Sequence, residues 1–175
     1  LSDADGDTKI QVEESSDEDI IRFDIAGSQI ARIESTGIIL DAGKTFQGTA
    51  TSAQYADLAE MYASDEEVEV GTVVHFVGEG KVGACDMDAC RSVAGVVSTD
   101  PAYLMNSAQD GVALALAGRV PTKVTGPVAA GDLMVSAGNG MALAEANPAL
   151  GTVIGKAIEA NEGGDGVIEV LVMMM

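Results

Sequence analysis

Aromatic and basic side chains are scarce in this chain of 175 residues, which contains no tryptophan and one histidine. Lysine and arginine together number 9 against 28 aspartate and glutamate residues, so the formal net charge is −19. We do not expect binding of nucleic acid, because basic side chains must replace the counterions condensed on the phosphates. Since aromatic residues make up only 3% of the chain, the core must be built from Val, Ile, Leu, Ala and Met.

Long apolar runs and cysteines are also few. No segment reaches the roughly 18 consecutive apolar residues that a membrane helix needs, and Leu1-Ser-Asp-Ala lacks the regions of a signal peptide, so we expect no membrane insertion. Cys85 and Cys90 are too sparse for a disulfide scaffold. They are free thiols or a local disulfide, because zinc would need two further ligands such as His75.

Apolar side chains in residues 1 to 48 recur at alternate positions, a pattern typical of short β-strands. The positions are Ile10, Val12, Ile21, Phe23, Ile25, Ile38 and Leu40. Three or four such strands present one narrow apolar face, and a small meander buries too little area to offset about 1–2 kcal/mol of backbone entropy per residue. We therefore expect a trimeric β stalk, in which identical chains around a threefold axis cover this face.

Residues 49 to 64 form the expected connector. Ser52 can cap a short helix that places Tyr55, Leu58, Ala59 and Tyr62 at i, i+3, i+4 and i+7. The alternative is an extended connector in which Tyr55 and Tyr62 pack on the neighbouring domain.

Residues 65 to 175 contain compact apolar runs separated by Gly, Pro or Asn, such as Thr72-Val-Val-His-Phe-Val and Val167-Ile-Glu-Val-Leu-Val. Runs of this kind are typical of a β-barrel or β-sandwich. Gly126-Pro-Val-Ala-Ala-Gly-Asp predicts a tight turn in which Gly131 takes a positive φ. The expected fold is therefore all-β, with a stalk followed by a β-rich head.

Several of these strings resemble a known class of proteins. Asp3-Ala-Asp-Gly-Asp-Thr-Lys-Ile-Gln-Val-Glu-Glu and Asp17-Glu-Asp-Ile-Ile-Arg-Phe-Asp resemble repeat-like segments of tail-fibre and other virion structural proteins of marine bacteriophages, cyanophages in particular. Val93-Ala-Gly-Val-Val-Ser-Thr-Asp-Pro, Val112-Ala-Leu-Ala-Leu-Ala-Gly-Arg-Val-Pro and Gly131-Asp-Leu-Met-Val are similar to the carboxy-terminal domains of phage fibres. More distantly, they are similar to the autoproteolytic cleavage domain of pre-neck appendage proteins.

This resemblance implies a homotrimeric virion appendage that contacts other virion proteins and attaches to a receptor on the host surface. It carries over no receptor-contacting residue and implies no cofactor. One alternative is a self-cleaving intramolecular chaperone that assists fibre trimerisation. Another is a bacterial surface binding module. No catalytic residue is predicted, so the leading interpretation is a structural protein and not an enzyme.

Asp3, Asp5 and Asp7 around Gly6 are candidate calcium ligands, because oxygen ligands at alternate positions around a glycine turn suit this cation. The distal bidentate glutamate of a full calcium loop is missing, and a polar hairpin turn explains the same residues. The metal prediction is therefore none, with these three aspartates as weak calcium candidates.

Residues that could carry other chemistry also have structural interpretations. His75 lies in an apolar run and is expected to be a strand residue with its polar edge satisfied. Asn106-Ser107 and Asn161 are the positions that hint at self-cleavage through backbone chemistry. Arg22, Arg32 and Arg119 are expected to pair with acidic residues between chains, and Met173-Met-Met to pack as the end of a strand.

Overall fold

The computed structural model describes residues 1–12, 14–46 and 56–173, and these residues form β-strands and no helix. The expected all-β fold is confirmed. Within the described residues no helix has the length and hydropathy to cross a membrane. The chain divides into two compact units, Leu1–Thr51 and Ser52–Met175.

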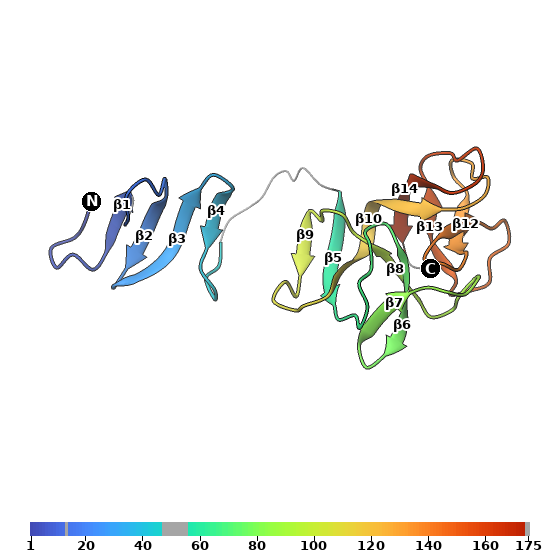
Figure 1. Cartoon of the computed structure of the whole chain (residues 1–175), viewed down its shortest axis with the longest axis horizontal. Helices are drawn as coiled ribbons and strands as arrows, with labels where there is room; N and C mark the ends of the chain where they lie inside the picture. Colours follow the sequence, from blue (N-terminus) through green and yellow to red (C-terminus); the bar gives the residue numbers. More distant parts are fainter. Residues whose placement is uncertain (13, 47–55, 174–175) are drawn as a thin grey trace. The chain divides into compact units, whose positions relative to one another are not determined.

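The first unit is a four-stranded antiparallel sheet in which the strands follow one another in chain order (Figure 1). Its strands are β1 (Lys9–Val12), β2 (Ile21–Ile25), β3 (Ser28–Glu34) and β4 (Gly37–Leu40). The predicted alternation is confirmed in β1, β2 and β4, and β3 is the further strand of the meander. A register shift between Phe23 and Asp24 marks a bulge where β2 pairs with β3.

The second unit is one sheet that partly closes on itself. Its first five strands are β5 (Asp57–Tyr62), β6 (Val73–Gly78), β7 (Lys81–Ala84), β8 (Val93–Val97) and β9 (Tyr103–Met105). The others are β10 (Val112–Val124), β11 (Leu133–Ser136), β12 (Ala142–Ala144), β13 (Val153–Ala157) and β14 (Gly166–Met173). Strands β12, β11, β13, β14 and β10 are neighbours in this order, and β12 pairs again with β10, which closes a five-stranded barrel.

Strand β10 joins the barrel to the remaining strands. Its first half pairs with β5 on one edge and with β8 on the other, and its second half pairs with β14. Strands β6 and β7 extend the sheet beyond β8, and β9 adds to β5. A single strand of 13 residues is therefore shared by both halves of the unit.

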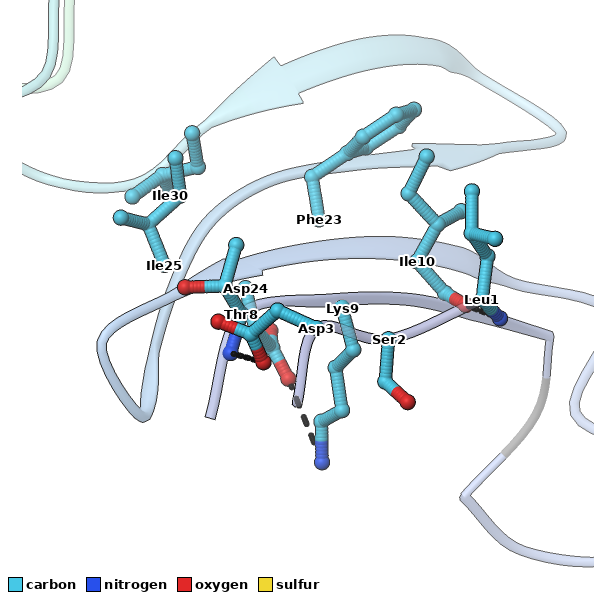
Figure 2. A pocket seen from close by; sticks show the side chains of 10 residues that line it. All are labelled: Leu1, Ser2, Asp3, Thr8, Lys9, Ile10, Phe23, Asp24, Ile25 and Ile30. Atoms are coloured by element: carbon cyan, nitrogen blue, oxygen red, sulfur yellow. Dashed lines mark hydrogen bonds and ion pairs between the residues drawn. The ribbon is translucent and has the colours of Figure 1, made fainter. Parts of the chain in front are cut away.

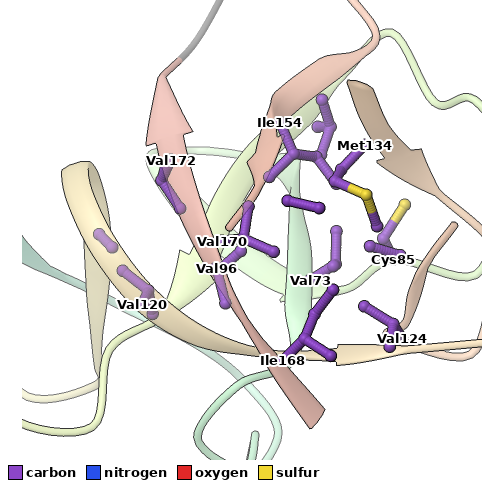
Figure 3. Close-up of a cluster of buried hydrophobic side chains, with 14 of the residues drawn as sticks. Val73, Cys85, Val96, Val120, Val124, Met134, Ile154, Ile168, Val170 and Val172 are labelled. Atoms are coloured by element: carbon purple, nitrogen blue, oxygen red, sulfur yellow. The ribbon is translucent and has the colours of Figure 1, made fainter. Parts of the chain in front are cut away.

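Two buried clusters use the alternation of these strands. Val73, Val96 and Ala115 point into the barrel cluster, while the next or preceding residues Val74, Val97 and Leu114 belong to a second cluster on the other side of the sheet. Figure 3 shows the barrel cluster, in which Val120, Met134, Ile154 and Val170 converge from different strands. Aliphatic side chains thus form the core, as the composition predicts.

The predicted connector helix is wrong where the structure describes it. Residues Asp57–Tyr62 form strand β5, in which buried Asp57 and Ala59 alternate with exposed Leu58. Tertiary pairing overrides the weak helical pattern, because β10 and β9 offer hydrogen-bonding edges on both sides of this segment. Tyr55 lies outside the described residues. Strand β5 therefore belongs to the sheet of the second unit.

The turn at Gly131 has a clear sequence signal, whereas two short strands have none. Gly131 has a φ of 95°, and the Asp132 carboxylate accepts a hydrogen bond from the backbone N–H of Ala129 at 2.8 Å. The predicted turn is confirmed. Strands β7 and β9 were not anticipated, because Lys81-Val-Gly-Ala and Tyr103-Leu-Met have too few residues to establish a period.

Truncating the barrel core tests the packing. Met134 is fully buried, so Met134→Ala should lower the free energy of unfolding by about 2–5 kcal/mol, from the lost transfer energy and the cavity left behind. Chemical denaturation followed by circular dichroism measures this loss. Leu150 is 84% exposed, and Leu150→Ala should change stability by less than about 0.5 kcal/mol. Equal effects of the two substitutions would contradict the described core.

Candidate assembly interface

One face of the first sheet is apolar and uncovered within the described residues of its unit. The registers pair Ile10 with Phe23, Phe23 with Ala31 and Ala31 with Leu40, so these side chains project from the same side. We call this surface the apolar face, and it consists of Ile10, Val12, Ile21, Phe23, Ile25, Ala31, Ile33, Ile38 and Leu40. Six of these nine side chains are between 36% and 74% exposed.

A pocket of about 460 Å³ opens beside β1 on this surface. Leu1, Ile10, Phe23, Ile25 and Ile30 contribute its apolar walls. Figure 2 shows Ile10 and Phe23 directed away from the side chain of Lys9, which lies on the other side of the strands. The apolar face is therefore not flat, and apolar side chains of a complementary surface could fill this pocket.

The opposite face of the same sheet is charged, and its charges are paired within the chain. We call it the polar face; it carries Lys9, Gln11, Arg22, Asp24, Gln29, Arg32 and Ile39. Lys9 Nζ lies 3.6 Å from Asp24 Oδ2, and Arg32 Nε lies 2.9 Å from Glu34 Oε2. The Arg32 guanidinium holds the pKa of the Glu34 carboxyl below its usual value.

Glu18 and Arg22 form the strongest of these pairs. Both guanidinium ends of Arg22 donate to the Glu18 carboxylate, with Nη1 3.0 Å from Oε2. The same oxygen accepts hydrogen bonds from the backbone N–H groups of Glu14 and Ser15. The Arg22 hydrogen bonds, followed by the Glu14 bond, lower the pKa of Glu18 from 4.5 to about 2.

The three arginines find their partners inside the chain, although we expected pairing between chains. Arg22 binds Glu18, Arg32 binds Glu34, and Arg119 Nε lies 3.5 Å from Glu169 Oε2. The Glu18–Arg22 pair has an i, i+4 spacing that could have suggested an intrachain contact, but here a loop and a strand bring the two side chains together. Each of these three arginines therefore has an acidic partner within its own chain.

Asp3, Asp5 and Asp7 come together at the hairpin turn that precedes β1. One carboxylate oxygen from each lies within 4.8 Å of the others, and all three residues are exposed. Asp3 Oδ1 accepts hydrogen bonds from the backbone N–H groups of Gly6 and Thr8 at 3.1 and 3.2 Å. These bonds give the turn a structural explanation, and the three aspartates stay weak calcium candidates beside the prediction of no metal.

His75 occupies β6 as expected, but its Nδ1 is buried without a hydrogen-bond partner among the described residues. The expectation that its polar edge is satisfied is therefore wrong for this nitrogen. Cys85 and Cys90 are free thiols buried in the barrel cluster. Neither belongs to a group of three potential metal ligands within the described ranges, which leaves zinc without support.

Asn106 and Asn161, the two positions that hinted at self-cleavage, have structural roles. The Asn161 side-chain amide donates to the carbonyl oxygens of Gly126 and Gly164, at 2.7 and 3.0 Å. Asn106 has a φ of 54° and donates to the carbonyl of Met61. Both side chains are engaged in holding loops.

Aromatic platforms for sugar stacking do not gather in the described residues. Tyr62 and Phe76 contact each other edge to face, with ring centroids 5.9 Å apart.

Met173, the last described residue, pairs with Ala117 at the end of β14, and the two residues after it lie outside the description. The apolar face is therefore the most extensive feature that calls for a partner.

Acidification tests the Glu18–Arg22 pair. Because the pKa of Glu18 is depressed in the folded state, its stabilising contribution is complete above pH 4.5 and is lost as the pH falls towards about 2. Glu18→Gln should therefore reduce the loss of thermal stability across this window, measured by circular dichroism. As a control, Asp17→Asn removes a neighbouring carboxylate that makes no hydrogen bond or ion pair within the described residues, and the wild-type pH profile should persist. Identical profiles for wild type and Glu18→Gln would contradict the pairing.

Thiol reactivity tests the burial of the cysteines. Burial raises the pKa of the Cys85 thiol, and the reactive species is the thiolate. A disulfide reagent such as dithionitrobenzoate should label no thiol in the folded chain and both thiols after denaturation. Rapid labelling of the folded chain, or no labelling of the denatured chain, would contradict two buried free thiols.

No protein-family model and no curated protein matches this chain. The resemblance to phage fibre proteins therefore stays a prediction. The functional interpretation starts from the apolar face.

Proposed function

We propose that this chain is a structural component of a homotrimeric fibre in which three copies of the first unit pack their apolar faces together. The observation that carries the proposal is the row of Ile, Val and Leu side chains left exposed on one side of a single-layer sheet. Fully burying one such side chain stabilises by about 1.5–3 kcal/mol, so the face gains most from an apolar partner. An identical sheet offers a surface of matching chemistry.

The dimensions of the sheet suit a threefold arrangement. Strand β2 has five residues and therefore spans about 17 Å, at about 3.3 Å per residue. A triangular prism with sides of about 17 Å places each sheet about 5 Å from the axis, which is half the roughly 10 Å separation of packed sheets. The side chains of three apolar faces would therefore fill the prism without a channel.

The connectivity of the meander suits a fibre. The strand order β1-β2-β3-β4 means that the chain enters the sheet at one edge and leaves it at the opposite edge. Further strands can continue such a sheet along one axis, with each strand running across that axis. Repetition of the motif would therefore lengthen the prism and leave its cross-section unchanged.

Charge favours the same orientation. The polar faces would lie outside the prism, where their ion pairs are already made within each chain. The net charge of −19 per chain would repel neighbouring particles and would disfavour association through any charged surface. The apolar face carries no charge, so contact between two such faces brings no like charges together.

The resemblance to phage fibre proteins supports placing such a trimer in a bacteriophage tail fibre or appendage. Its partners there would be further copies of the chain and other virion proteins. Attachment to the host surface is the usual role of a fibre tip, and we propose it as the purpose of the second unit. The chain would then act in the extracellular virion.

Light scattering coupled to size-exclusion chromatography tests the assembly. At micromolar concentration the full chain should show three times the mass of the 17.8 kDa protomer. Ile38→Asp places a charge in the apolar face, and the cost of burying it should shift the mass to that of the protomer. Ile38 is 74% exposed in the single chain, so this substitution should leave the protomer folded.

Ile39→Asp is the matched control, because Ile39 follows Ile38 in β4 but faces the polar side opposite Arg32. This variant should keep the wild-type mass. A monomeric or dimeric wild type would contradict the proposed trimer. So would an Ile38→Asp variant that elutes as wild type, or equal dissociation of both variants.

A further inference from the structure

A second pocket lies in the second unit, at a place where the sequence suggested no site. The first residue of β5, the loop after β8 and side chains of β10 and β14 enclose about 330 Å³. This volume lies at the lower end of the range of small-molecule sites, about 300–1,000 Å³. Its charged and hydroxyl-bearing walls include Asp57, Ser98, Asp100, Arg119 and Glu169.

The backbone holds the two innermost polar residues firmly. The Asp57 carbonyl accepts a hydrogen bond from the N–H of Ala102 at 2.9 Å, and Ser98 N–H donates to the Ala113 carbonyl at 2.7 Å. Gly118 lets β5 begin close to β10, because a Cβ at this position would collide with the Ala56 carbonyl oxygen. Backbone hydrogen bonds thus fix the first residue of β5 and the start of the loop after β8, and residues of β10 and β14 complete the pocket.

Two buried polar atoms at this pocket have no partner. Asp57 is 7% exposed and Ser98 is 4% exposed. Asp57 Oδ2 and Ser98 Oγ make no hydrogen bond to any described residue. Buried polar groups are nearly always hydrogen-bonded, and a buried charge without a partner is especially costly. The Asp57 carboxylate and the Ser98 hydroxyl belong to residues that line one pocket, so a ligand that donates hydrogen bonds could satisfy both.

The charges of the pocket select a positive donor. Asp57, Asp100 and Glu169 contribute three carboxylates against the single guanidinium of Arg119. Arg119 lies 3.5 Å from Glu169, and the described residues provide no basic partner for Asp57 or Asp100. The uncompensated charge is therefore negative, and a cation would gain from both remaining carboxylates.

The arrangement favours an ammonium group over a metal ion. Within the described ranges, the ligand atoms of three acidic, histidine or cysteine side chains converge only at Asp3, Asp5 and Asp7. The carboxylates of this pocket are thus too dispersed to share one metal ion. An ammonium group carries three donors that point in different directions, which suits one carboxylate oxygen and one hydroxyl from separate elements. A planar guanidinium is better suited to paired oxygens of one carboxylate.

We propose that this pocket binds a primary alkylammonium group, such as a lysine side chain or a small polyamine carries. The ammonium pairs with the Asp57 carboxylate and the Ser98 hydroxyl, and the Asp100 carboxylate adds electrostatic attraction at the rim. This inference is independent of the proposed trimer, because Asp57 and Ser98 belong to the second unit and not to the apolar face.

Titration calorimetry with the full chain tests the proposal. Nα-acetyl-lysine amide represents the peptide source and cadaverine the polyamine source, and heat with either probe supports an ammonium site. Nα,Nε-diacetyl-lysine amide has lost the charge and should bind at least about tenfold more weakly. Equal binding of the acetylated probe, or no binding of either amine, overturns the proposal. Preference for calcium over both amines also overturns it.

Variants assign the binding to the pocket. Asp57→Asn should weaken amine binding at least about tenfold, and Ser98→Ala several-fold. Asp110→Asn removes an exposed carboxylate outside the pocket and should bind as wild type. If Asp110→Asn weakened amine binding as much as Asp57→Asn does, net charge alone would explain the binding. That result would overturn the proposed site.

Thermal unfolding separates binding from folding. Asp57→Asn removes a buried carboxylate that has no hydrogen-bond partner for Oδ2 among the described residues. Without amine, the Tm of this variant should therefore be no lower than that of wild type and up to about 4 °C higher. Amine should raise the Tm of wild type and not that of the variant. A large fall in Tm for the amine-free variant would show that Asp57 stabilises the fold and would overturn its role as an open acceptor. Light scattering of the same samples measures their mass, so a change in oligomeric state can be told apart from a change in amine binding.

Discussion

Alternating strands must cover their apolar side, and the two units of this chain meet that requirement differently. Strand pairing satisfies backbone hydrogen bonds in both, but it leaves side chains projecting from each face of the sheet. The second unit closes β10 to β14 into a barrel and packs a second cluster behind it, so both faces of its central strands are buried. The described residues of the first unit form one layer and leave its apolar face uncovered. The proposed assembly follows from this difference.

Electrostatics complements this division of surfaces. A chain with 28 acidic and 9 basic residues cannot neutralise its own charge, yet the cations of the first sheet are all placed beside carboxylates on the polar face. Exposed ion pairs contribute little stability individually, but Glu18 also organises a loop by accepting backbone hydrogen bonds. Pairing of charge on one face leaves the other free of charge, which is the condition for close approach of identical acidic chains.

The pocket at Asp57 and Ser98 illustrates the opposite situation. Here a closed and well-packed unit retains a buried carboxylate and a buried hydroxyl without hydrogen-bond partners among the described residues. Such groups weaken a fold unless something outside it satisfies them, so their retention in a rigid pocket is better explained by binding than by stability. The apolar face and this pocket are thus two kinds of surface, and we propose that apolar burial completes the first and a charged donor the second.

Local pattern and composition were enough to predict the all-β class, the strands that carry alternating Ile and Val, the aliphatic core and the turn at Gly131. These features depend on the period of side-chain direction and on backbone freedom at one residue, both of which are local properties. The strand at Asp57–Tyr62, the pairing of Arg119 with Glu169 and the pocket around Asp57 depended on contacts between distant segments. A helical spacing at 55–62 could not reveal that β10 and β9 offer open edges to the same residues. Neighbours across a sheet are set by the path of the whole chain, because strand pairing joins segments that lie far apart in the sequence.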